Sequence, residues 1–240
     1  MNDYEKTVES NLNTYLDNYE NVFGHSHRPL DLNTERYKKN IAFFGCSFTY
    51  GLGVENEKTY PSQVQKLSGN EWNCLNFGVP GGSLDLVYVI YNKVIKEIDI
   101  DCVVVQWPSI YRRMYFDEGK YVSPFHPWEN EISKYFAKIS DSDYCVVRNL
   151  SNLQVINSFK KTFNLQSQLG TVDITVTSGF SHTVKNLREL FEKYGIGNML
   201  EFPFYVDDET PNEHKLSDGH PNPLWYSSYA KYLYKELKDE

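Results

Sequence analysis

The stretch "IAFFGCSFTYG", residues 41–51, decides the fold of this chain. Its first half is the apolar run Ile41–Phe44 of a strand expected at 40–44, and such a run is typical of a parallel strand covered by helices on both faces. The run ends in Gly45, Cys46 and Ser47, and Gly51 follows shortly after. A small, polar turn flanked by glycines either ends the strand or lifts a nucleophile out of the sheet.

Strands and helices alternate along the rest of the chain. Further strands are expected at 72–77, 101–107, 171–179 and 199–206. Helical spacing predicts helices at 59–67, at 84–98 after the N-cap Ser83, at 144–166 for most of its length, at 184–194, and from Pro223 onward. This order predicts an α/β fold with three layers, α/β/α, around a doubly wound, mainly parallel sheet of about five strands. Functional sites in such folds lie beyond the carboxyl ends of the strands.

The length of 240 residues suits one α/β domain with an added segment. Residues 1–39 form an N-terminal extension, with an amphipathic helix predicted over 3–23 and a polar loop after it. The domain proper covers 40–240 and carries an insertion around 108–143. Aromatic residues are frequent over 107–128, which suits a wall for a sugar or an acyl group, although aromatic residues also pack cores.

Composition and spacing exclude several functional classes. The formal net charge of −8 provides no basic field for nucleic acid or an anionic membrane. The four cysteines form no C-x-x-C pair, and His25 and His27 lack neighbours at ligand spacing, so we expect no metal and no cofactor. The N-terminus lacks the apolar core of a signal peptide and no run is long enough to span a membrane, so we expect a cytoplasmic protein.

A candidate hydrolytic site can be assembled from three polar loops. A serine hydroxyl needs a base, a group that orients the base, and donors for an oxyanion. Ser47 follows the first strand, and Asp218 and His220 precede the last helix. Glycines of the loop after the second strand, Gly81 among them, have unhindered amides that can point at an oxyanion.

These loops resemble the three sequence blocks of the SGNH, or GDSL-like, hydrolases. "FFGCSFTYG" (43–51) is similar to the strand and G-D-S turn, "NFGVPGG" (76–82) to the glycine block, and "SDGHPNP" (217–223) to the block that carries the base. The resemblance covers the chain from about residue 40 to its end. It implies the flavodoxin-like SGNH fold, with Ser47 as nucleophile and His220 as base. It also implies that the amides of Ser47 and Gly81 are oxyanion donors.

Two departures from the family pattern concern the supporting residues. The asparagine that usually follows the third strand is missing, and either Ser109 or Gln106 replaces this oxyanion donor or the donor is absent. The orienting carboxylate usually stands three residues before the histidine, whereas Asp218 stands two before His220 and requires a different loop path. Cys46 offers a thiol as an alternative nucleophile, but its side chain is expected to point inward.

The resemblance implies a metal-independent serine esterase that hydrolyses a small acyl ester, including O-acetyl groups on carbohydrate. The expected partner is therefore a small-molecule or carbohydrate ester, and the oligomeric state stays open. Two alternatives remain. An O-acyltransferase would pass the acyl group to a sugar hydroxyl, and a non-catalytic protein on a degenerate SGNH scaffold would bind carbohydrate or protein.

Overall fold

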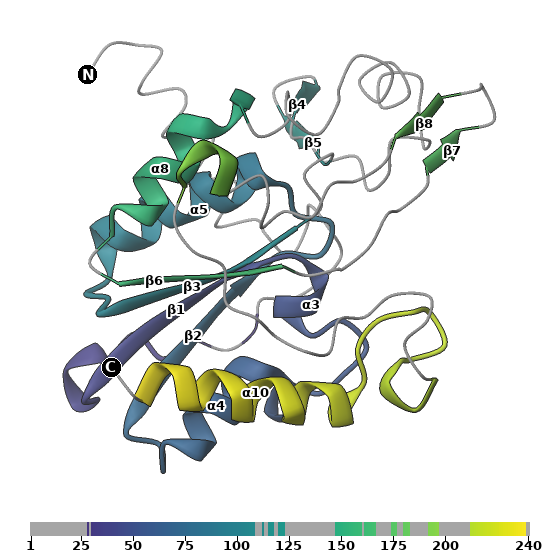
Figure 1. Cartoon of the computed structure of the whole chain (residues 1–240). Helices are drawn as coiled ribbons and strands as arrows, with labels where there is room; N and C mark the ends of the chain where they lie inside the picture. Colours follow the sequence, from purple (N-terminus) through teal and green to yellow (C-terminus); the bar gives the residue numbers. More distant parts are fainter. Residues whose placement is uncertain are drawn as a thin grey trace.

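Four parallel strands form the central sheet in the computed structural model of the chain (Figure 1). The model describes residues 28, 30–108, 112, 115–117, 120–122, 147–159, 161–166, 174–176, 180–182, 192–196 and 212–238. The strands lie in the order β2 (Trp72–Gly78), β1 (Lys39–Gly45), β3 (Cys102–Trp107) and β6 (Thr162–Gln166), and each neighbouring pair is parallel. The predicted doubly wound parallel sheet is confirmed.

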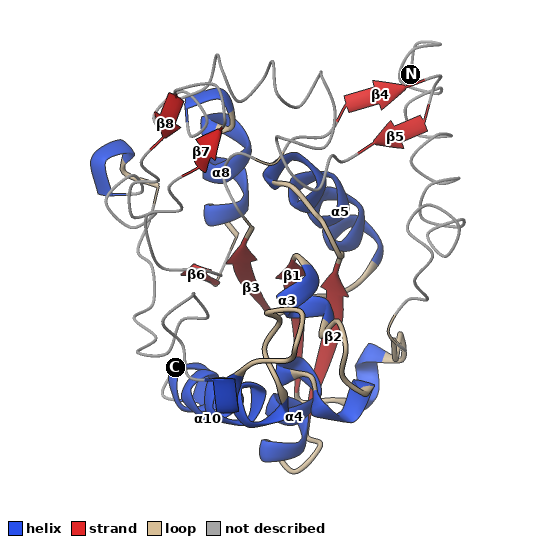
Figure 2. Ribbon diagram, turned by 90° about the vertical axis from the view of Figure 1, so that its right-hand side faces the viewer, coloured by secondary structure: helices blue, strands red, loops and turns tan. Residues whose placement is uncertain are grey.

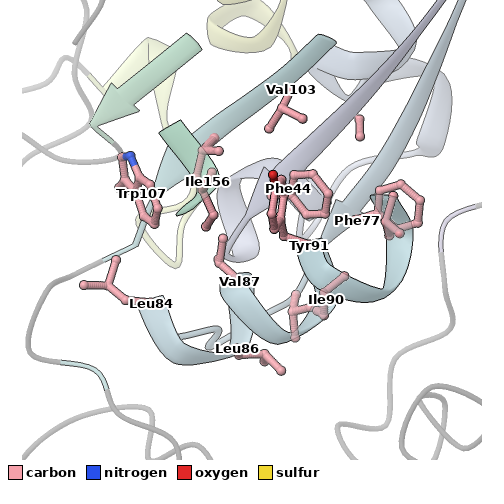
Figure 3. Packing of buried hydrophobic residues seen from close by; sticks show 14 of the residues in the cluster. Phe44, Phe77, Leu84, Leu86, Val87, Ile90, Tyr91, Val103, Trp107 and Ile156 are labelled. Atoms are coloured by element: carbon pink, nitrogen blue, oxygen red, sulfur yellow. The ribbon is translucent and has the colours of Figure 1, made fainter. Parts of the chain in front are cut away.

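Helices cover both faces of this sheet and complete the predicted three layers (Figure 1). One face carries α4 (Tyr60–Leu67) and α10 (Pro223–Lys238), and the other carries α5 (Leu84–Glu97) and α8 (Leu150–Asn157). Side chains of β1 alternate between the two faces, as strand geometry requires. Ile41 and Phe43 pack on the α4 and α10 side, whereas Ala42 and Phe44 pack on the α5 side, where Figure 3 shows Phe44 beside Phe77 and Tyr91.

The helix boundaries follow local signals in the sequence. The hydroxyl of Ser83 accepts a hydrogen bond from the backbone amide of Leu86, so Ser83 is the N-cap of α5. Pro61 lies in the first turn of α4, where its missing amide hydrogen costs nothing. Short 3-10 helices add η1 (Thr34–Arg36), η2 (Asn56–Lys58) and η3 (Asn212–His214). The predictions for α4, α5 and α10 are confirmed to within a residue or two, whereas no prediction was made for the 3-10 helices.

The position of the fourth strand was predicted wrongly. The described part of the range 171–179, Ile174–Val176 (β7), does not join the main sheet and pairs with Phe180–His182 (β8) in a separate antiparallel pair. The fourth strand is β6, inside the segment 144–166 that was expected to be mostly helical. Pairing with β3 decides this, since Asn164 lies opposite Val105 and its Oδ1 accepts a hydrogen bond from Trp107 Nε1 at 2.9 Å.

Several other predictions lie outside the described residues. These are the helix over 3–23, the fifth strand at 199–206, most of the helix at 184–194 and most of the insertion around 108–143. Within the insertion, Tyr115–Asp117 (β4) pairs antiparallel with Lys120–Val122 (β5). Trp107, the first residue of the aromatic-rich stretch 107–128, is buried in the core, which agrees with the core-packing alternative for this residue (Figure 3). Among the helices that the structure describes, none has the length and hydrophobicity needed to cross a membrane.

Candidate active site

Ser47 follows the carboxyl end of β1, where the strand order reverses. The chain leaves β1 for β2 on one side and then crosses to β3 and β6 on the other. Ligand sites of open α/β sheets lie at such a switch point. The short helix α3 (Ser47–Tyr50) stands at this end of the strands in Figure 2.

Helix α3 is one turn long and packs directly on the end of the sheet. Cys46 is its N-cap residue, Ser47 is its first residue, and Gly51 ends it in the left-handed conformation. A Cβ atom at Gly78 would lie 2.2 Å from the backbone nitrogen of Tyr50, so only glycine permits this close approach of α3 to β2. The glycine that ends the second strand, Gly78, is therefore required for the position of Ser47.

Ser47 and His220 are 173 residues apart in the sequence and meet at this edge. The hydroxyl oxygen of Ser47 lies 3.0 Å from Nε2 of His220, within hydrogen-bonding distance. Ser47 is only 5% exposed, and the imidazole of His220 packs edge-on against Phe48 with ring centroids 5.7 Å apart. The next residue of α3 thus supports the histidine that contacts Ser47.

Asp218 contacts His220 through both carboxylate oxygens. Oδ1 accepts a hydrogen bond from the His220 amide at 3.0 Å, and Oδ2 lies 3.2 Å from Nδ1 of the imidazole. The second contact has the distance of an ion pair, but its direction departs from that of a hydrogen bond. Partial burial raises the pKa of Asp218, but the His220 amide and imidazole together outweigh this and leave the pKa below its ordinary value.

Gly219 supplies the loop path that the short spacing between Asp218 and His220 requires. Its φ of +84° lies in the left-handed region, which bends the chain back between the two residues. The loop is closed by hydrogen bonds from Gly219 N to Leu216 O at 3.0 Å and from Leu216 N to His220 O at 2.7 Å. A carboxylate two residues before the histidine therefore reaches the imidazole.

The glycine block lies beside the end of β1. The amide of Val79 donates to the carbonyl of Gly45 at 2.9 Å, and the amide of Gly82 donates to the carbonyl of Val79 at 2.9 Å. Gly81 has a φ of +71° within this turn. The loop that contains Gly81 therefore adjoins the strand end that carries Ser47.

The structure corrects the expectation for Gln106 as an oxyanion donor. Its side chain is fully buried, accepts a hydrogen bond from Thr49 Oγ1 at 2.9 Å and donates one to Tyr229 Oη at 3.3 Å. Gln106 thus supports α3 from below, whereas Ser109 lies outside the described residues. Cys46 is buried in the cluster on the α10 side, as expected for a side chain that points inward.

The sequence analysis missed the buried polar network under α3. Thr49 Oγ1 lies 2.9 Å from Tyr60 Oη as well as from Gln106, so the network joins α3, β3, α4 and α10. The polar Gln106 near the end of the apolar run "CVVVQW" could have indicated this network. A polar side chain in a buried strand needs hydrogen-bond partners from neighbouring elements. Within the part of the chain that the structure describes, no group of three or more His, Cys, Asp or Glu side chains could hold a metal ion.

Comparison with known proteins gives a fold but no sequence relative. No protein-family model matches the chain, and no curated protein matches its sequence significantly. Among solved structures, a GDSL-like lipase from Bacteroides thetaiotaomicron has a TM-score of 0.55 at 14% identity, covering 96% of this chain and 98% of that one. A member of the lipolytic G-D-S-L family from Veillonella parvula has a TM-score of 0.53 at 15% identity, covering 80% and 94%.

A carbohydrate acetylesterase family member from Sinorhizobium meliloti is similar to the same degree. Its TM-score is 0.52 at 12% identity, with coverage of 83% of this chain and 97% of that one. At such identities the likeness establishes architecture. The chain therefore has the fold of the SGNH, or GDSL-like, hydrolases, as its three sequence blocks predicted.

Proposed function

We propose that this protein is a serine esterase of the SGNH type that hydrolyses a small acyl ester through an acyl-enzyme on Ser47. The observation that carries the proposal is the 3.0 Å contact between Ser47 Oγ and His220 Nε2. A serine and a histidine in hydrogen-bonding contact, with a carboxylate on the other ring nitrogen, have the geometry of an activated nucleophile. The fold shared with lipolytic G-D-S-L proteins supports this assignment.

Acylation begins when Ser47 Oγ attacks the carbonyl carbon of the ester. His220 Nε2 takes the hydroxyl proton as the new carbon–oxygen bond forms, and the carbonyl oxygen becomes an oxyanion. When the tetrahedral intermediate collapses, the bond to the alcohol breaks and His220 returns the proton to the departing oxygen. Asp218 holds the imidazole in the tautomer that presents Nε2 to Ser47 and stabilises the imidazolium.

Deacylation repeats these steps with water. His220 Nε2 removes a proton from a water molecule, which attacks the acyl carbon, and Ser47 Oγ leaves and regains the proton as the acid is released. In both steps the backbone amides of Ser47 and Gly81 donate hydrogen bonds to the oxyanion, with Ser109 as the proposed third donor. Losing one such donor costs about 100- to 1000-fold in rate. The identity of the third donor therefore decides how fast this enzyme is.

The proposed substrate is a small or carbohydrate-linked acyl ester. The similarity to a carbohydrate acetylesterase supports O-acetyl groups on sugars as the first substrates to test. Activity on acetylated sugars is expected to exceed activity on long acyl esters. Assays of acetylated xylose and of aryl esters of increasing chain length measure this preference.

Labelling with a fluorophosphonate tests the proposal, because only an activated serine reacts with this probe. We expect the wild type to be labelled, Ser47→Ala to lose labelling, and His220→Ala to react slower by several orders of magnitude. Cys46→Ala and Ser228→Ala are the controls, and both are expected to retain labelling. The first tests the thiol, and the second removes a half-buried serine of α10 whose hydroxyl donates to the carbonyl of Leu224.

Each alternative predicts a different result. A folded wild type that is never labelled would refute the esterase and favour the non-catalytic binding protein. A labelled wild type that transfers acetyl groups to an added sugar faster than to water would assign the O-acyltransferase. Loss of p-nitrophenyl acetate hydrolysis in Cys46→Ala but not in Ser47→Ala would assign the thiol as nucleophile.

A further inference from the structure

Arg28 belongs to the segment before the first strand, yet its side chain lies against the turn that carries Ser47. Its guanidinium donates hydrogen bonds from Nε to Tyr50 O at 2.8 Å and from Nη2 to Val54 O at 2.8 Å. Nη2 also donates to the carbonyl of Gly51. The guanidinium carbon lies 4.5 Å from the centre of the Tyr50 ring, so the group also stacks on that ring.

Helix α3 needs such a partner because it is only four residues long. Isolated single helical turns are unstable, and the last carbonyl groups of a helix find no hydrogen-bond donor within the helix itself. Asn76 Nδ2 donates to the carbonyl of Thr49 at 2.8 Å, and Arg28 satisfies the carbonyls of Tyr50 and Gly51. A cation at this end of the turn is also favoured by the direction of its peptide dipoles.

The segment that Arg28 binds contacts the histidine loop as well. A Cβ atom at Gly53 would lie 2.6 Å from Cδ1 of Leu216, so the chain after α3 touches the loop that closes onto His220. One guanidinium therefore holds the segment that joins the serine turn to the histidine loop.

We propose that Arg28 is a positioning residue that clamps the 50–54 segment and thereby sets the contact between Ser47 and His220. This inference rests on the proposed esterase function for its effect on rate, although the clamp itself does not. It assigns a role to the N-terminal extension, because the residue that secures the nucleophile turn comes from outside the domain that the sequence delimits at 40–240.

Arginine is required for this role by its shape. Its planar guanidinium presents several donors in a rigid fork and stacks on an aromatic ring, whereas lysine is a compact point charge. Three carbonyl oxygens around one guanidinium match the fork. Arg28→Lys keeps the charge near the turn but cannot bind all three oxygens, so it is expected to restore only part of the function.

The test compares Arg28→Ala and Arg28→Lys with the wild type in the full chain. The fluorophosphonate labelling rate and kcat for p-nitrophenyl acetate are expected to fall about 10- to 100-fold in Arg28→Ala, because small displacements of reacting groups cost this much. KM changes little, since Arg28 touches no substrate. Arg28→Lys falls between the two, and guanidinium at a non-denaturing concentration restores part of the rate of Arg28→Ala.

Arg36→Ala is the matched control. Arg36 lies in the same N-terminal segment and also stacks on a tyrosine, Tyr37, but its guanidinium binds Asp31 and Tyr37 rather than the 50–54 segment. Its labelling rate should equal that of the wild type. Hydrogen exchange of the amides of 50–54 is the second readout, and it should increase in Arg28→Ala while staying unchanged in Arg36→Ala.

Two results would overturn the inference. In the first, Arg28→Ala leaves both the labelling rate and the hydrogen exchange of 50–54 at wild-type values. In the second, Arg28→Ala lowers labelling only in proportion to the unfolded fraction measured by circular dichroism. A wild type that is never labelled refutes the esterase proposal instead, and the exchange of 50–54 then decides by itself whether Arg28 clamps the turn.

Discussion

Tyr60 and Tyr226 stack on one another under the candidate site, but their hydroxyl groups have different surroundings. Tyr60 Oη lies 2.9 Å from Thr49 Oγ1, whereas the hydroxyl of Tyr226 is buried without a hydrogen-bond partner among the residues that the structure describes. Burial raises the pKa of both phenols, so both stay neutral at physiological pH. The two residues form a matched pair in which only one hydroxyl contributes a hydrogen bond.

We expect Tyr60→Phe to lower the free energy of unfolding by about 1 kcal/mol, because it leaves Thr49 with one partner fewer. Tyr226→Phe removes an unsatisfied buried hydroxyl and should leave the free energy of unfolding unchanged or raise it by up to about 1 kcal/mol. Urea denaturation of both variants measures the difference. Equal losses in the two variants would show that Tyr226 has a partner in solution, such as a buried water.

At the scale of single elements, the loop from Leu216 to His220 depends on the left-handed conformation of Gly219. Gly69, after α4, is its matched control, because its φ is +70° and a Cβ atom at either glycine meets no atom within 4 Å. Steric crowding is therefore absent at both positions. Any cost of a substitution comes from the backbone conformation alone.

Gly219→Ala and Gly69→Ala should each lower the free energy of unfolding by roughly 1–2 kcal/mol, the cost of a left-handed residue with a Cβ atom. Only Gly219→Ala should also slow fluorophosphonate labelling, because it displaces Asp218 relative to His220. Denaturation and labelling of both variants provide the measurement. Slower labelling in Gly69→Ala as well would mean that the rate responds to general stability rather than to the loop.

At the scale of the whole molecule, β1 is shared by two hydrophobic clusters, one on each face of the sheet. Phe43 belongs to the cluster with α4 and α10, and Phe44 belongs to the cluster with α5 and α8. Both side chains are fully buried. Because the strands β1 and β3 each contribute side chains to both clusters, loss of packing on either face should destabilise the entire sheet.

Phe43→Ala and Phe44→Ala should therefore each lower the free energy of unfolding by about 3–5 kcal/mol, and each variant should still unfold in one transition. Leu224→Ala is the control, since Leu224 is 54% exposed and its loss should cost less than about 0.5 kcal/mol. Urea denaturation followed by fluorescence and circular dichroism tests this. Transitions that separate between the two probes would mean that the faces unfold independently.

The local sequence pattern correctly predicted those helices and strands whose conformation depends little on the elements that pack against them. The strands β1 and β3 contain apolar runs that only a sheet covered on both faces can bury, and Ser83 and Pro61 mark helix starts through their own chemistry. The strand β6 was missed because it is short and follows a helix, and its pairing with β3 decides its conformation. Context outweighs propensity most readily in such short segments.

The sequence by itself determined the fold class and predicted Ser47, His220 and Asp218 as candidate site residues, since each is marked by the residues beside it. Only the tertiary structure decided how they meet: Ser47 Oγ at 3.0 Å from His220 Nε2, Gln106 buried under α3, and Arg28 on the carbonyls after it. The physical reason is that these contacts join residues far apart in the chain. Their distances depend on how the sheet, the glycine turns and α10 pack together, and no local pattern contains that information.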